Sequence, residues 1–219
     1  MSNMKDTEKI TIKRFDTIEM LNEYVVNKLV RTIKSNPEAK IMLSGGNTPR
    51  PIYEKFDALG KQSNGCSFVS SDERLVPVNN KLSNEGMLRK YLKNYDNSQI
   101  LSLHDKEIKK MLREIPVYDI ALLGMGLDGH FASIFPKMDN LNEAIFSNDP
   151  ICEVNTGVPD VPRVSLTMSE ILKAKSIMLL VADQEKLSLF EDVLQAPNEK
   201  PISKLITFAE GLEALIIKN

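Results

Sequence analysis

A histidine and an aspartate stand two residues apart in the glycine-rich segment 124–130, which reads GMGLDGH. An imidazole titrates near neutral pH, so His130 could take up and return a proton at physiological pH. Asp128 could fix the tautomer and the orientation of that imidazole. His104, the other histidine of the chain, lies in a plain Leu-His-Asp segment, and we expect it at the surface or at a helix cap. The pattern predicts proton transfer centred on His130.

Three charged residues, Asp72, Glu73 and Arg74, directly follow a predicted strand. Such a run can be a solvated turn in which Arg74 pairs with Glu73. If it lines a pocket instead, Asp72 could orient a group or accept a proton, and Arg74 could neutralise an anion with its planar set of donors. The residue types are compatible with both interpretations.

A third segment joins a predicted strand to a helix that begins near Pro49, and comprises Ser44, Gly45, Gly46, Asn47 and Thr48. Adjacent glycines let the backbone approach a ligand closely, and the start of the following helix offers unpaired N–H groups. This combination suits a phosphate group. Without a ligand, the same residues would form only a tight strand-to-helix turn. The GK[ST] ending of a Walker loop is missing.

The glycines of the segment 124–130 also match the bare spacing of the dinucleotide fingerprint GxGxxG. That motif belongs early in a strand–helix–strand unit and needs an acidic residue about twenty positions later. Here it occurs in mid-chain, and residues 131–136 do not begin a long helix. We therefore expect no nicotinamide cofactor.

The elements that must position these segments follow from the apolar pattern, which changes repeatedly between helical and strand spacing. Helices are expected from an N-cap at Asp16 to Ser35, from Pro49 onward, and at 83–91, 105–114, 169–174 and 184–194. Buried strands are expected at 39–43, 66–71, 118–123, 164–167, 176–181 and 214–217. Alternation of this kind predicts an α/β, Rossmann-like fold in which helices cover both faces of a mainly parallel sheet.

We find no repeat or shift in composition, so residues 1–219 are expected to form one domain. Ligands of open α/β sheets gather at the carboxyl ends of the strands. The chemistry-bearing segments after Leu43, Ser71 and Leu123 all come at such ends. We therefore expect them to share one site.

Composition limits the class of partner. The net charge of −2 and the isoelectric point near 5.8 exclude the broad basic face that a nucleic acid or an anionic membrane requires. Cys66 and Cys152 show no metal-binding spacing, and we expect two buried, reduced thiols and no metal. The N-terminal residues 1–13 are polar and lack a hydrophobic signal region. We expect a cytoplasmic protein.

Taken in order, these segments resemble the 6-phosphogluconolactonase family, within the wider glucosamine-6-phosphate isomerase/deaminase-like fold. The matching stretches are LSGGNTPRPIYE (43–54), SDERLVP with SNEGM (71–87), YDIALLGMGLDGHFASIFP (118–136), PRVSLT (162–167) and Gln184-Glu185-Lys186. They span nearly the whole chain. The resemblance implies hydrolysis of 6-phospho-D-glucono-1,5-lactone to 6-phosphogluconate in the oxidative pentose phosphate pathway, without a metal or cofactor.

The resemblance also implies roles. We expect His130 to act as general acid and base on an attacking water, with Asp128 orienting it. Arg74 is expected to stabilise charge near the reacting end or the sugar hydroxyls, and Asp72 completes the catalytic set. Phosphate is expected at Ser44, Gly45, Gly46, Asn47 and Thr48, with full charges from Arg163 and Lys186.

Two positions depart from the family pattern. Phe131 stands where a threonine usually follows the histidine, and Leu75 stands where an aromatic residue is frequent. Loss of the threonine hydroxyl could tighten the pocket or alter the rate.

Two other functions stay open at this point. The deaminases typically carry Asp-Glu-Tyr where this chain has Asp72-Glu73-Arg74, and an acidic residue soon after the histidine, whereas 131–136 contains none. A deaminase or isomerase is therefore the enzymatic alternative. A sugar-phosphate-sensing module without turnover is the other, although it leaves His130 without a purpose. The sequence does not distinguish a monomer from a homodimer.

Overall fold

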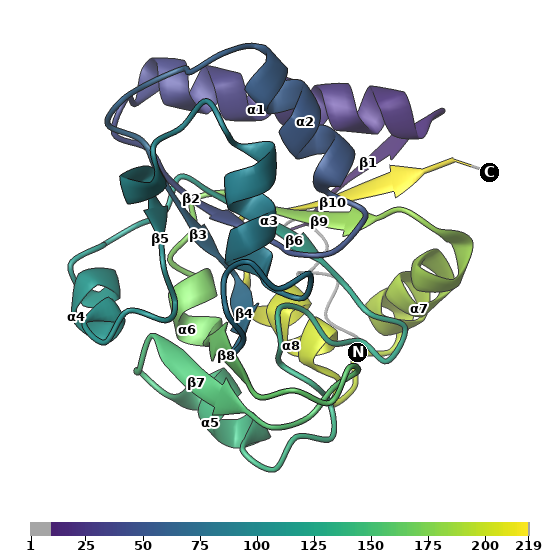
Figure 1. Ribbon diagram of the computed structural model, residues 1–219. Helices are drawn as coiled ribbons and strands as arrows, with labels where there is room; N and C mark the ends of the chain where they lie inside the picture. Colours follow the sequence, from purple (N-terminus) through teal and green to yellow (C-terminus); the bar gives the residue numbers. More distant parts are fainter. Residues whose placement is uncertain (1–9, 219) are drawn as a thin grey trace.

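A seven-stranded parallel sheet forms the centre of the protein, and its strands follow the order β1-β10-β9-β6-β2-β3-β5 (Figure 1). The computed structural model describes residues 10–218, so the expected polar start of the chain falls largely outside the described residues. The strands are β1 (Ile10–Phe15), β2 (Lys40–Leu43), β3 (Ser67–Ser70), β5 (Ile100–Leu101), β6 (Ile120–Gly124), β9 (Ile177–Val181) and β10 (Leu212–Ile217).

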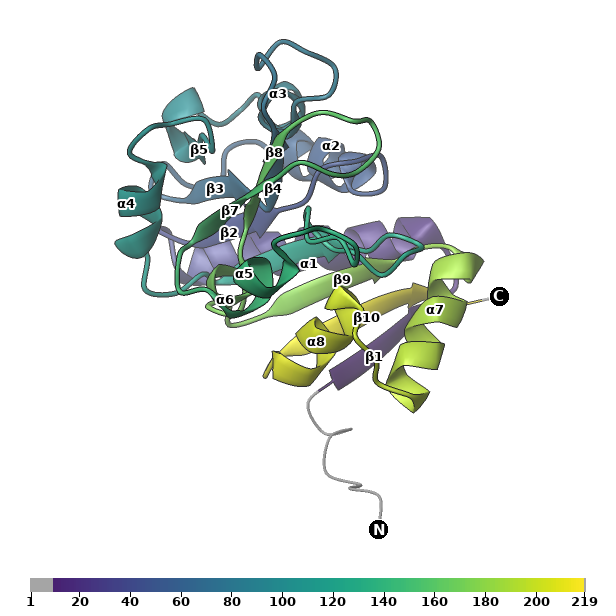
Figure 2. The ribbon, with the colours of Figure 1, turned by 90° about the horizontal axis from the view of Figure 1, so that it is seen from below.

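Helices cover both faces of this sheet (Figures 1 and 2). One face carries α1 (Ile18–Ser35), α2 (Arg50–Ala58) and α3 (Asn84–Tyr91). The other carries α4 (Ile108–Arg113), α5 (Leu141–Phe146), α6 (Met168–Ile171), α7 (Gln184–Gln195) and α8 (Pro201–Phe208). The predicted α/β fold with a mainly parallel sheet is confirmed. No helix within residues 10–218 is long and apolar enough to cross a membrane.

Strand β6 shows why the sheet needs cover on both sides. Its residues Ile120 and Leu122 pack into the core beneath α1, while Ala121 and Leu123 pack into the core on the opposite face. All four are buried. Because successive side chains of a strand point to opposite faces, a continuous apolar run can be satisfied only by two cores.

A second, antiparallel sheet lies on the α5–α8 face (Figure 2) and contains β4 (Asp72–Arg74), β8 (Arg163–Leu166) and β7 (Ile151–Val154). Two expectations are corrected here. The charged run at 72–74 is a strand and not a loop, and the strand expected at 164–167 belongs to this small sheet. The chain leaves the main sheet at Ser71, whose carbonyl accepts from the Leu166 amide, so β4 pairs with β8.

Other boundaries also differ from the prediction. The N-cap of α1 is Thr17 and not Asp16, because the Thr17 hydroxyl accepts from the amide of Met20. Helix α4 begins at Ile108, since Asp105 accepts from the Glu107 amide and caps a preceding turn. Four short elements (β1, β5, β7 and α5) and the proline-initiated α8 were not expected from the pattern.

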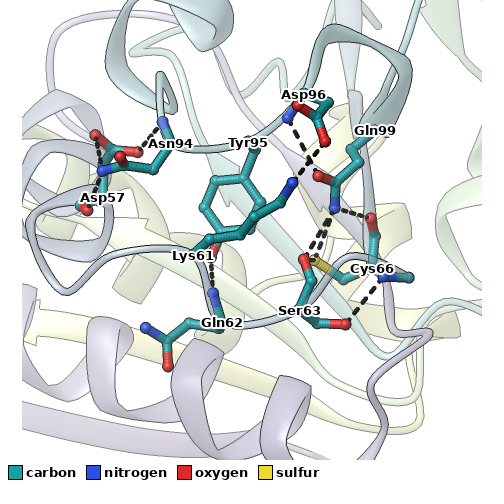
Figure 3. Close-up of polar contacts among 10 residues, drawn as sticks. Asp57, Lys61, Gln62, Ser63, Cys66, Asn94, Tyr95, Asp96 and Gln99 are labelled. Atoms are coloured by element: carbon teal, nitrogen blue, oxygen red, sulfur yellow. Dashed lines mark hydrogen bonds and ion pairs between the residues drawn. The ribbon is translucent and has the colours of Figure 1, made fainter.

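A polar network fastens the connection after α2 to the segment that precedes β5 (Figure 3). The side chain of Asp57 accepts from the backbone and the side-chain amides of Asn94. The side-chain amide of Gln99 donates to the backbone carbonyl of Cys66 over 2.8 Å. Both cysteines are free and buried, as predicted, and burial raises the pKa of the Cys66 thiol.

Candidate active site

A cleft of ≈ 870 Å³ opens at the carboxyl ends of β2 and β6. Every site residue expected from the sequence contributes to its wall: Ser44, Gly45, Gly46, Asn47, Thr48, Asp72, Arg74, Asp128, His130, Arg163 and Lys186. The carboxyl-end rule thus located the shared site correctly, while the role of each residue remains a prediction.

The imidazole of His130 is held by the loop that carries it, residues 124–130, here called the histidine loop. Nδ1 of His130 lies 2.6 Å from Oδ1 of Asp128, and the backbone N–H of His130 donates to the same oxygen over 3.1 Å. The amide of Gly126 donates to the carbonyl of His130. A Cβ on Gly126 would lie 2.2 Å from Cε1 of His130, so only glycine leaves room for the ring.

The ionisation of Asp128 decides which atom donates in the hydrogen bond between Asp128 and His130. Burial raises the pKa of the Asp128 carboxyl, but the hydrogen bonds and the electrostatic attraction of His130 outweigh it and hold that pKa below its usual range. An ionised Asp128 can only accept, so Nδ1 carries the proton of the 2.6 Å contact. The other ring nitrogen, Nε2, is thereby left free to accept a proton.

Phe135 packs against the side chains of His130 and Arg163. Its ring centroid is 4.5 Å from that of His130, and the guanidinium carbon of Arg163 lies 5.5 Å from the Phe135 ring centroid; all three residues line the cleft. A Cβ on Gly157 would come within 2.7 Å of Phe135. The backbone at Gly157 therefore packs directly against the Phe135 ring. That ring in turn contacts the imidazole of His130 and the guanidinium of Arg163 and restricts their orientation.

Two arginines from neighbouring strands bring positive charge into the cleft. Arg74 stands opposite Arg163 in the β4–β8 register. Arg163 is only 3% exposed and its Nη2 donates to the carbonyl of Pro159. Burial lowers the pKa of Arg163, the charge of Arg74 lowers it further, and Asp72 opposes both. Bound anions would relieve the repulsion between the two guanidinium groups.

The expected alternative of a solvated turn with an Arg74–Glu73 ion pair is wrong. Glu73 is fully buried, and its carboxylate accepts from the backbone amides of Arg74, Asn84 and Glu85. The guanidinium of Arg74 instead donates to the Leu82 carbonyl over 2.9 Å and to Oδ1 of Asn84 over 3.3 Å. Glu73 is therefore a structural anchor, and Arg74 is left free of a carboxylate within the described residues.

Asp72 connects the two sheets. Its Oδ2 accepts from the Ser133 hydroxyl over 2.6 Å, and its Oδ1 accepts from the Ser71 hydroxyl and the Asn84 amide. Asp72 is 5% exposed. With both oxygens engaged by neighbours, this carboxylate is better suited to orienting the site than to transferring a proton.

The glycine-rich segment 44–48, here called the glycine loop, forms another part of the cleft wall. A Cβ on Gly45 would lie 2.0 Å from Oδ1 of Asn84, and Gly46 has a φ of +92°, which favours glycine. The hydroxyl of Ser44 is buried and has no hydrogen-bond partner among residues 10–218. Lys186, in the first turn of α7, also reaches the cleft, where its Nζ lies 2.8 Å from Oδ2 of Asp183.

A possible metal-binding group lies outside the cleft lining. Carboxylates of Glu73 and Glu85 and a ring nitrogen of His104 come within 4.8 Å of one another. Three N–H groups and a hydroxyl already occupy Glu73, and Glu85 forms an ion pair with Arg89. These carboxylates have their partners within the protein. His104 is exposed, in keeping with the surface position expected for it.

Sequence reasoning missed several residues of the wall, namely Asn84, Phe135, Lys137, Gly157 and Lys200. None of these residues belongs to a sequence motif that by itself indicates a role in binding or catalysis. Phe131, the departure from the family pattern, does not enter the cleft: it is fully buried in the core below the histidine loop. The effect of losing the threonine hydroxyl on the pocket or the rate stays a prediction.

Comparison with known proteins decides the family. The family model described as glucosamine-6-phosphate isomerases/6-phosphogluconolactonase matches residues 13–212. The chain belongs to this family. The 6-phosphogluconolactonase of Thermotoga maritima is 30% identical over 193 residues, covering 81% of this chain and 84% of that protein. That of Neisseria meningitidis serogroup A is 28% identical, covering 87% and 90%.

Solved structures of the family share the fold. The crystal structure of a 6-phosphogluconolactonase from Shewanella baltica superposes with a TM-score of 0.86 at 23% identity, covering 97% of this chain and 99% of that one. A monomeric glucosamine-6-phosphate deaminase superposes with a TM-score of 0.80 at 18% identity, covering 95% and 97%. The fold is therefore shared by a 6-phosphogluconolactonase and a glucosamine-6-phosphate deaminase, and fold alone does not distinguish the two activities.

Proposed function

We propose that this chain hydrolyses 6-phospho-D-glucono-1,5-lactone to 6-phospho-D-gluconate, a step of the oxidative pentose phosphate pathway. The observation that carries the proposal is the Asp128–His130 pair beside a cleft whose wall has five cationic side chains and only two carboxylates. Such an excess of positive charge suits a phosphorylated sugar, in a chain whose net charge is −2. Family membership and the names of the curated relatives support the same reaction.

The first step is attack of water on the lactone carbonyl. As the water oxygen bonds to C1, Nε2 of His130 takes the proton, and the ionised Asp128 stabilises the imidazolium that forms. General base help of this kind contributes about 10²–10⁴ in rate. The negative charge moves to the carbonyl oxygen, where the Arg74 guanidinium supplies a charged donor. One well-placed donor of this kind is worth ~2.7–4 kcal/mol in the transition state.

The second step breaks the bond between C1 and the ring oxygen. The imidazolium of His130 returns its proton to that oxygen, so the ring opens as an alcohol and the base is regenerated. The new carboxylic acid then loses a proton to solvent. Atoms and charge balance without an oxidant or a cofactor, because an ester carbonyl is already electrophilic.

The phosphate group would bind at the other end of the cleft. The glycine loop offers its own backbone N–H groups, just before α2, and the unpaired hydroxyl of Ser44. Arg163 and Lys186 would add full positive charges from the small sheet and from α7.

The deciding experiment is a coupled assay in which the lactone is generated in situ from glucose 6-phosphate. The wild-type protein should accelerate hydrolysis above the spontaneous rate, and His130→Asn should lose about 10²-fold or more of that acceleration. Wild-type-like turnover of this variant would remove His130 from the mechanism. His104→Asn, which changes the other histidine outside the cleft, is the matched control and should keep full activity.

The fold similarity to a deaminase gives one competing activity. Incubation with glucosamine 6-phosphate should release no ammonia, since residues 131–136 provide no second carboxylate for the additional proton transfers. Ammonia release at a rate above that of lactone hydrolysis would replace the proposed activity with deamination.

A further inference from the structure

Lys200 lies against the histidine loop although it comes from a distant part of the chain. It immediately precedes α8, and the amide of Ile202 donates to the carbonyl of Gly129 over 2.9 Å. The Nζ of Lys200 donates to the carbonyl of Asp128 over 3.5 Å. A Cβ on Gly129 would lie 3.0 Å from Cδ of Lys200. The lysine stem therefore lies along the glycine, and the ammonium group is directed to the residue that holds His130.

The charge of Lys200 is not used by another side chain. Within residues 10–218 no carboxylate lies within ion-pair distance of its ammonium group, whereas Lys186 pairs with Asp183 and Lys204 pairs with Glu199. Lys200 is half-buried and forms part of the cleft wall. An ammonium group that has lost part of its hydration and has no carboxylate partner gains stability when an anion binds to it.

The proposed reaction creates an anion at the matching end of the cleft. Hydrolysis converts a neutral ester at C1 into a carboxylate, by way of an oxyanion on the same carbon. His130 must be next to C1 to take the proton of the attacking water, and Lys200 contacts the loop that carries His130. The glycine loop, Arg163 and Lys186 are left for the phosphate.

We propose that Lys200 is a further ligand-binding residue of this site and forms the subsite for the C1 carboxylate of the product and for the oxyanion that precedes it. The inference rests on the proposed function, because that reaction places a new charge at C1. It adds to that function a cation contributed by the segment before α8.

The test is to measure binding of two ligands that differ only at C1. Titration calorimetry with 6-phosphogluconate, which has a carboxylate there, is compared with glucitol 6-phosphate, which has a hydroxymethyl group. Lys200→Met should weaken binding of 6-phosphogluconate about tenfold and leave the affinity for glucitol 6-phosphate within a factor of two. Lys200→Arg, which keeps the charge, should restore most of the loss.

Two further variants make the comparison specific. Lys204→Met removes a lysine of α8 that is not among the cleft-lining residues, and both affinities should stay at the wild-type value. Lys186→Met should weaken both ligands alike, because both carry the phosphate. In the coupled lactone assay Lys200→Met should lower kcat severalfold, since the oxyanion loses one of its cations.

Equal weakening of both ligands by Lys200→Met would assign the lysine to the phosphate end and overturn the inference. Unchanged affinity for 6-phosphogluconate would overturn it as well. Failure of the proposed function looks different: wild-type protein without lactone hydrolysis, whatever the binding data. Selective loss of 6-phosphogluconate binding in such a protein would still assign a carboxylate subsite to Lys200.

Discussion

Replacing Gly126 by alanine would put a methyl group into the space that the His130 imidazole occupies. The added Cβ would lie 2.2 Å from Cε1 and 2.3 Å from Nδ1 of that ring. Carbon atoms in contact normally stay about 3.5–4.0 Å apart, so the ring must move by more than about 1 Å. Its 2.6 Å hydrogen bond with Asp128 cannot survive such a shift.

The size of the effect follows from this displacement. A misplacement of about 1 Å at a reacting group costs about 10²-fold in rate. We expect Gly126→Ala to lower kcat for lactone hydrolysis about 10²-fold and to change KM little, because the glycine loop lies elsewhere in the cleft. The cost in folding stability should be small, since the side chain of His130 is 31% exposed and can swing toward solvent.

Gly124→Ala is the matched control for this prediction. It adds the same methyl group to the same loop, where a Cβ meets nothing within 4 Å. Its kcat should stay within about threefold of the wild-type value, and both variants should unfold at similar urea concentrations. A Gly126→Ala protein that is folded and turns over at the wild-type rate would refute the view that this glycine is required for the position of the imidazole.

Three further predictions concern the charges and the glycine loop. Asp128→Asn should lower kcat by at least tenfold. Because the pKa of Asp128 is depressed in the folded protein, the ionised carboxylate stabilises the fold above the ordinary carboxyl pKa of about 3.9, and this stabilisation is lost as the pH falls through the lower, folded-state pKa. The urea midpoints of variant and wild type should therefore differ at pH 7 and converge at acid pH. Arg163→Ala should mainly raise KM for the lactone, and an unchanged KM would exclude a phosphate contact. Gly45→Ala should displace Asn84, which a Cβ would approach to 2.0 Å, and should raise KM without altering the pH profile of kcat.

The main sheet could be predicted because its strands are buried on both faces. A run such as Ile120, Ala121, Leu122 and Leu123 leaves no polar face for solvent, so crossover connections and two layers of helices follow. The shared position of the three chemistry-bearing segments follows in turn, since parallel strands end at one edge. Neither conclusion needs a long-range contact to be known.

The small sheet could not be predicted for the opposite reason. Its strand β4 consists of Asp72, Glu73 and Arg74, and three consecutive charges do not indicate a strand. Glu73 can be buried there because the amides at the start of α3 and the Ser83 hydroxyl satisfy its carboxylate. That compensation depends on residues about ten positions away, which no local pattern reveals.

Residues such as Phe135 and Lys200 were missed for a related reason. A phenylalanine next to a proline and a lysine before a helix are ordinary in sequence, and only the tertiary arrangement brings them to the imidazole and its loop. Phe131 illustrates the converse. Its place directly after His130 suggested a role in the pocket, yet the backbone turn at Ala132, with a φ of +48°, accompanies a side chain directed into the core.

The division of the cleft between two sheets has a consequence for how its width is set. The glycine and histidine loops belong to the large sheet, while Arg74 and Arg163 belong to the small one. Two hydrogen bonds join the segment after the histidine loop to the small sheet beside the site. The Ser133 hydroxyl donates to Asp72 over 2.6 Å, and the Ser133 backbone amide donates to the Ser165 hydroxyl over 3.2 Å. Ser133 and Ser165 do not line the cleft. Substituting them would therefore change the distance between the two arginines and His130 without changing any residue of the cleft wall. The length of substrate that the cleft accepts could thus be altered by residues outside it.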